Sequence, residues 1–65
     1  MTQVAVSDVK HGDVIAFDVH EPVWVVALKV QADRHGFDVL YQPDGEAPRW
    51  RGFDDGDRVL RRDDV

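Results

Sequence analysis

Apolar and polar residues alternate along most of this chain, and a period of two residues is typical of β-strands. Between residues 13 and 19, for example, Ile15, Phe17 and Val19 fall on one face of an extended chain. The pattern returns in four later segments, each bounded by a turn sequence rich in Gly, Pro or Asp. The predicted strands are residues 13–19, 23–32, 37–42, 49–53 and 58–62.

Five short strands in a chain of 65 residues leave few compact arrangements. No segment of ten or more residues keeps an unbroken helical spacing of apolar positions, so we expect no long helix. An open sheet would expose its edges and one face, whereas a small bent barrel covers both. We therefore predict one all-β domain over residues 1–65, a five-stranded SH3-like barrel with short turns. Val6 and Val9, ahead of the first predicted strand, are expected to tuck beneath the barrel as an ordered cap.

The composition narrows the classes of function. A chain of this size buries only about 60% of the surface that its unfolded form exposes, which leaves little room for a deep catalytic cleft. There is no cysteine, so neither a disulfide framework nor a thiolate zinc site is expected. The longest apolar run, Val23 to Leu28, is too short to span a bilayer. We expect a soluble, cytoplasmic protein without a membrane partner.

Motifs for catalysis and for metal binding are missing from the sequence. Ser7 is the only serine and lacks the Gly-x-Ser-x-Gly context of a nucleophile, and no glycine-rich phosphate loop or dinucleotide fingerprint is present. His11, His20 and His35 lack paired ligand spacing, and residues 54–57 lack the distal Glu of a calcium loop. We therefore expect a protein that is not an enzyme and has no cofactor and no metal, with residues 54–57 forming a plain turn.

Aromatic and arginine side chains are the candidates for a binding surface. The three phenylalanines are expected to fill the core, because a small barrel needs several large side chains. Trp and Tyr often lie at a rim, where one polar atom stays exposed. Arginines on the last two strands and in the 33–36 turn lie near these rings in sequence and can contact carboxylates, rings or phosphates. The predicted partner-binding residues are Trp24, Tyr41, Trp50, Arg49, Arg51 and Arg34.

The charge balance favours a protein partner for this surface. Thirteen acidic residues stand against eight basic ones, a net charge of −5, whereas nucleic-acid binding requires a basic surface. The leading prediction is a small non-catalytic adaptor or regulator that binds another protein. A second copy of the chain is a candidate partner, since self-association would cover exposed strand edges. The alternative is a nucleic-acid- or ribosome-associated KOW-like barrel that uses the same arginines.

Three segments of the chain resemble a known domain. Asp8–Ile15, Trp24–Val30 and Phe53–Val59 are similar to the KOW-like, SH3-like N-terminal domain of elongation factor P, in which a Gly-Asp-x-Ile strand precedes a closing Phe-x-x-Gly-x-x-Val segment. The resemblance implies a small barrel. It also implies that Arg34 occupies the loop position that this family presents to the acceptor end of tRNA.

Overall fold

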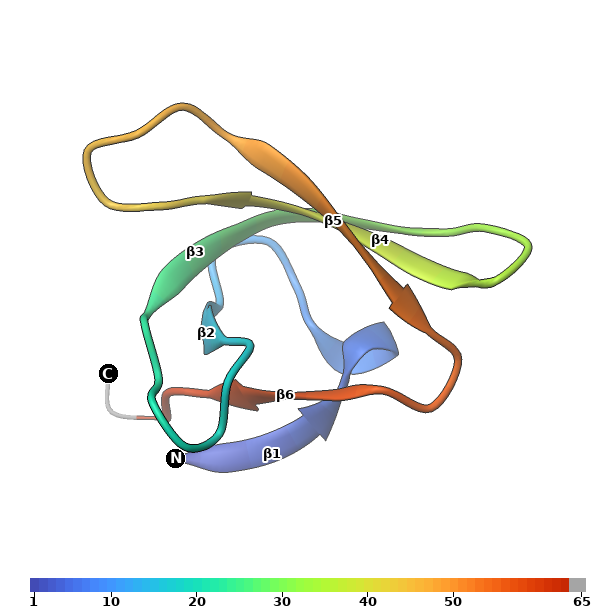
Figure 1. The fold of residues 1–65 in the computed structure, drawn as a ribbon, viewed down its shortest axis with the longest axis horizontal. Coiled ribbons are helices and arrows are strands. Elements are labelled where there is room, and N and C mark those ends of the chain that lie inside the picture. Colours follow the sequence, from blue (N-terminus) through green and yellow to red (C-terminus); the bar gives the residue numbers. More distant parts are fainter. Residues whose placement is uncertain (64–65) are drawn as a thin grey trace.

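The computed structural model describes residues 1–63, and this part of the chain forms one antiparallel sheet (Figure 1). Residues 64 and 65 of the predicted domain lie outside the described residues. The strands are β1 (Thr2–Ala5), β2 (Val14–Ala16), β3 (Val25–Ala32), β4 (Gly36–Gln42), β5 (Arg49–Asp54) and β6 (Arg58–Arg61). A single turn of 3-10 helix, η1 (Val6–Asp8), follows β1. The all-β prediction is confirmed, and the described residues contain six strands in place of five.

The strands follow the order β1-β6-β2-β3-β4-β5 across the sheet. In Figure 1 the sheet curls, so that β3, β4 and β5 cross above β1 and β6, with η1 beside the curl. Within residues 1–63 no ladder joins β1 to β5, so these two strands are the edges of the sheet. No helix in this part of the chain is long and apolar enough to cross a membrane.

The N-terminal segment contributes a strand that the sequence prediction missed. β1 pairs with β6, with Val4 opposite Val59, and both side chains are buried. The turn of η1 then directs Val6 and Val9 inward, where they are 1% and 5% exposed. The predicted packing of these two valines is therefore confirmed, although the segment ahead of them is a strand and not merely a cap.

The strand predicted over residues 13–19 is shorter, because an aspartate side chain ends it. β2 stops at Ala16, and the Asp18 carboxylate then accepts hydrogen bonds from the backbone N–H groups of His20, at 2.8 Å, and Glu21. Such local bonds compete with a strand ladder. They hold the pKa of Asp18 below its usual value of 3.8. Val19, predicted to share a strand face with Ile15 and Phe17, is 45% exposed as a result.

A β-bulge changes the facing of residues along β3. Val25 and Ala27 face the core as one alternating set, but the register with β4 shifts between Ala27 and Lys29. Beyond the shift Val30 packs against the core and Lys29 is exposed. An extra residue reverses the alternation and bends the strand. Val30 therefore lies on the same side as Val25 and Ala27, which unbroken alternation over the predicted strand 23–32 does not allow.

The buried core is made of aliphatic side chains. No polar or charged side chain is buried among the described residues. The three phenylalanines predicted for the core are partly buried and pack against its border. The buried cluster consists of Val4, Val6, Val9, Ile15, Val25, Ala27, Val39 and Val59. Aliphatic side chains therefore fill the space inside the curled sheet, and the aromatic rings lie at the border of this core.

Candidate partner-binding groove

Three aromatic rings from different parts of the chain meet at the border of the core. Phe17 lies directly after β2, while Tyr41 and Phe53 come from the core-facing sides of β4 and β5. The Phe17 and Tyr41 ring centroids are 4.8 Å apart at 78°, and those of Phe17 and Phe53 are 5.4 Å apart at 49°. Edge-to-face and tilted pairs of this kind are favourable ring arrangements.

Arg51 covers this aromatic cluster. It lies opposite Val39 in the β4–β5 ladder, so its side chain leaves β5 on the core-facing side. Its guanidinium carbon is 4.8 Å from the Phe17 ring centroid and 5.5 Å from that of Phe53. A cation over aromatic faces at an exposed site contributes about 0.5–1 kcal/mol. The cluster thus places a positive charge beside apolar rings.

A groove opens beside these rings, between the segment that connects β2 to β3 and the turn that connects β4 to β5. Its volume is about 230 Å³, below the roughly 300–1,000 Å³ of typical small-molecule sites. Val23 forms one side of it and is 74% exposed. The groove residues are Phe17, Val23, Val25, Tyr41, Pro43, Glu46 and Arg49. The space suits one or two side chains of a larger partner.

The far side of the groove is fixed by the β4–β5 turn. The backbone N–H of Glu46 donates to the carbonyl of Pro43 at 3.2 Å, and Gly45 takes a φ of 74°, which favours glycine. The Gln42 side-chain amide donates to the Glu46 carbonyl at 3.2 Å. The Glu46 carboxylate forms an ion pair with the Arg49 guanidinium. The charged edge of the groove is therefore built from a single local turn.

The structure brings only some of the predicted binding residues together. Tyr41 and Arg49 line the groove, and Arg51 lies beside it over the Phe17 ring. Trp50 points to the opposite face of β5, where it is 52% exposed and pairs across the ladder with Leu40. The alternation of a strand separates it from the two arginines that flank it.

Trp24 and Arg34 lie elsewhere. The Trp24 ring, just before β3, lies 5.5 Å from the guanidinium carbon of Arg62. Arg34 is in the β3–β4 turn, at the other end of β4 from Tyr41. Neither side chain lines the groove, although the neighbours of Trp24 in sequence, Val23 and Val25, do so.

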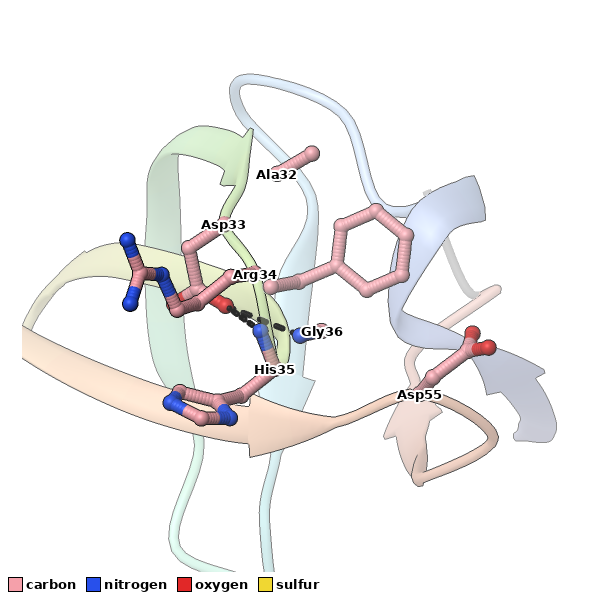
Figure 2. Close-up of a pocket in the computed structure, with 7 residues that line it drawn as sticks. Ala32, Asp33, Arg34, His35, Gly36 and Asp55 are labelled. Carbon is pink, nitrogen blue, oxygen red and sulfur yellow. Dashed lines mark hydrogen bonds between the residues drawn. The ribbon is translucent and has the colours of Figure 1, made fainter.

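Arg34 belongs to a second, more polar pocket of about 260 Å³ (Figure 2). The Asp33 carboxylate there accepts the backbone N–H groups of His35, at 2.7 Å, and Gly36, at 2.8 Å. Figure 2 shows Arg34 and His35 extending to one side of the turn, with Asp55 on the other. The described residues contain no group of three or more side chains placed to hold a metal ion. The Asp33 carboxylate thus stabilises its own turn.

Sequence reasoning missed several groove residues because their signals were local. Phe17 was assigned to the core, Val23 to a strand, and Pro43 and Glu46 to a turn. Two of these assignments agree with the structure, because Phe17 does pack against the core and the β4–β5 turn is formed. Nothing in the alternation pattern indicates that the segment after β2 folds towards the β4–β5 turn. That proximity depends on tertiary structure.

Comparison of the chain with models of protein families, with curated proteins and with solved structures finds no match. The function proposed below therefore rests on the residues and their geometry.

Proposed function

We propose that this protein is a non-catalytic binding module that holds an extended segment of a protein partner in the groove. The observation that carries the proposal is an apolar recess, open to solvent, in which Val23 is 74% exposed beside the ring of Tyr41. Apolar side chains gathered at a recess are typical of interaction sites. A peptide backbone lying across the recess would place one apolar side chain against them.

The charges around the groove indicate the chemistry of the segment. Arg51 lies over Phe17 and carries a positive charge beside the apolar lining, while Arg49 is offset by Glu46. An exposed ion pair such as Glu46–Arg49 contributes about 0–1 kcal/mol and exchanges partners at little cost. The segment that fits best has an aliphatic or proline side chain for the recess and a nearby carboxylate for Arg51.

We also propose that the curled sheet is an SH3-like barrel extended by the N-terminal strand β1. In support of this, β6 returns beside β2, and β3 pairs with both β2 and β4. The bulge between Ala27 and Lys29 gives β3 the bend that such a shared strand needs. In this arrangement the groove lies at the end of the barrel where β3 begins and β4 ends.

The alternative is a nucleic-acid surface built on the arginines, with Arg34 at a turn as the resemblance implies. Two observations favour the protein partner instead. Arg49 and Arg61 pair with the carboxylates of Glu46 and Asp63, and Arg51 lies over rings. The net charge of −5 opposes binding to a polyanion.

A matched pair of valine variants tests the groove. Peptides selected against the wild-type protein from a random display library serve as probes, and their affinity is followed by fluorescence anisotropy. Val23→Asp should weaken binding at least tenfold, because a charged, hydrated carboxylate would replace the apolar surface that the partner side chain contacts. Val19→Asp changes a 45% exposed valine of the same connecting segment that does not line the groove, and should leave the affinity unchanged.

Two outcomes would contradict the proposal. One is a set of peptides that bind Val23→Asp as tightly as the wild type. The other is the absence of selected peptides together with binding of a labelled single-stranded oligonucleotide. An affinity for that oligonucleotide that falls steeply with salt would support the nucleic-acid alternative.

A further inference from the structure

Strand β5 has one side that the described fold leaves open. It is an edge of the sheet and is six residues long, compared with four for β1 at the other edge. The backbone N–H and C=O of Gly36 both bond to Asp33, and Asp55 N–H donates to the His35 carbonyl at 3.2 Å. Gly36 and its ladder partner Asp54 are therefore a non-hydrogen-bonded pair.

This alternation determines which backbone groups of β5 point away from β4. Arg49, Arg51 and Phe53 bond to β4, while Trp50 and Gly52 direct their N–H and C=O groups outward. Asp54 also points outward, but its N–H donates to the Asp57 carboxylate at 2.8 Å and its carbonyl accepts from Asp57 N–H at 3.0 Å. Trp50 and Gly52 thus form an open edge suited to an added strand.

The charged residues on the two sides of Gly52 differ in sign. Arg49 and Arg51 precede it, and Asp54 and Asp55 follow it. An antiparallel copy related by a twofold axis at Gly52 would place each Arg49 opposite an Asp55. The same axis would place each Arg51 opposite a Phe53. A twofold axis at Arg51 would instead oppose two arginines, which is unfavourable.

We propose that two copies of the chain pair through β5, antiparallel and centred on Gly52, so that their sheets join. The two Gly52 residues would exchange N–H···O=C bonds, as a hydrogen-bonded pair does. Each Trp50 would face the partner's Asp54, whose carbonyl accepts from Asp57 N–H and has a second lone pair for the Trp50 N–H. Trp50 of each copy would lie diagonally beside the Gly52 of its partner and cover the space that glycine leaves. This accounts for a tryptophan that is 52% exposed on the face opposite the groove. A segment carrying both signs of charge in this order fits itself better than it fits a uniformly acidic or basic strand.

Charge reversal tests this pairing directly. Arg49→Asp with Arg51→Asp makes the edge acidic throughout, and Asp54→Arg with Asp55→Arg makes it basic throughout. In sedimentation equilibrium the wild type should approach twice its 7.4 kDa mass as concentration rises, and each double variant should remain a monomer. An equimolar mixture of the two variants should regain the mass of a dimer, because opposite charges then face each other.

The pairing would be overturned by a wild-type protein that stays monomeric at millimolar concentration. It would equally be overturned by double variants that are folded by circular dichroism but dimerise alone as well as the wild type. Failure of the folded variants to associate when mixed would also contradict it.

A cysteine variant tests the register without altering charge. The chain has no cysteine, and a side chain at Gly52 would meet only the Asp38 carboxylate oxygen, at 3.4 Å. Facing residues of a hydrogen-bonded pair have Cα atoms about 5.5 Å apart, within the range of a disulfide. Oxidised Gly52→Cys should cross-link at least tenfold faster than Gln31→Cys, at an exposed position on β3. Equal rates for the two variants, or no cross-link at Gly52→Cys, would contradict the register.

Discussion

At the scale of single residues, four acidic side chains of this protein act as turn-forming groups. Carboxylates of Asp13, Asp18, Asp33 and Asp57 each accept a backbone N–H from within three residues. The sequence predicted the 33–36 and 54–57 turns from their glycines and aspartates, and both are formed. Four of the thirteen negative charges therefore fix backbone conformation. Composition alone indicated only an acidic surface.

The carboxyl groups of Asp33 and Asp38 interact with each other at the β3–β4 hairpin. Partial burial, followed by the hydrogen bond with Asp33, raises the pKa of Asp38. The backbone N–H of His35 is the main cause that lowers the pKa of Asp33. A raised carboxyl pKa means that the folded state binds the proton more tightly than the unfolded state. Ionised Asp38 therefore costs stability above its folded pKa, and this cost disappears as pH falls through it.

Asp38→Asn should raise the free energy of unfolding at pH 7, because the amide can donate a hydrogen bond to the Asp33 carboxylate and carries no second negative charge. The gain should shrink as pH falls through the raised pKa of Asp38 towards 3.8, where the wild-type carboxyl is itself protonated. Urea denaturation at several pH values measures this difference. Asp44→Asn, in the exposed β4–β5 turn, is the control and should change little. An Asp38→Asn variant no more stable than wild type at pH 7 would refute the expectation.

At the scale of elements, the later part of the chain was the more predictable. The strands predicted over 37–42, 49–53 and 58–62 match β4, β5 and β6 to within one residue at each end. Local alternation and turn signals sufficed there. β1 was missed because its main partner, β6, is at the other end of the chain. Simple alternation along β3 does not hold beyond its bulge, which no local signal marks.

The candidate site was predicted only in part, because the prediction placed on one surface residues that a strand directs to opposite faces. Tyr41 and Arg49 do line the groove, and both face the core side of their strands. Trp50 lies between Arg49 and Arg51 in sequence, so strand alternation already placed it on the other face. Grouping the three on one surface conflicted with that alternation. The structure thus divides these three residues between the two faces of β5, while Trp24 and Arg34 lie elsewhere.

The close approach of the β3–β4 turn to β5 gives a prediction at this scale. A Cβ atom at Gly36 would lie 2.3 Å from the Phe53 carbonyl oxygen and 2.6 Å from the Asp55 nitrogen. Both are backbone atoms, so Gly36→Ala should destabilise the protein by roughly 1–3 kcal/mol or more, as overpacking does. Gly45→Ala is the control, since its φ is 74° but nothing lies within 4 Å of the added atom.

Gly45→Ala should cost only the strain of a left-handed conformation, about 1–2 kcal/mol. Urea midpoints of the two variants measure the difference between them. A Gly36→Ala variant as stable as Gly45→Ala would show that β5 can move away from the turn, and would contradict the close approach as a source of stability.

At the scale of the whole molecule, the side chains that form the core are different from those that are available for contacts with a partner. Aliphatic side chains fill the curl of the sheet, and the radius of gyration is only 10.9 Å. The rings and arginines that this core does not enclose are distributed over the groove and over β5. A chain this small buries a limited share of its surface by itself, so binding of the proposed partner would add appreciably to its stability.

The most direct test of the proposed function is to map a selected peptide onto the protein by NMR. Backbone amide shifts of the ¹⁵N-labelled protein would be followed during titration with the peptide, at low and at moderate salt. We predict that the largest changes occur at Val23, Tyr41 and Arg49 and persist as salt rises, because apolar contacts are little screened. Changes concentrated at Arg34 and His35, or changes that vanish with salt, would contradict the groove as the binding site.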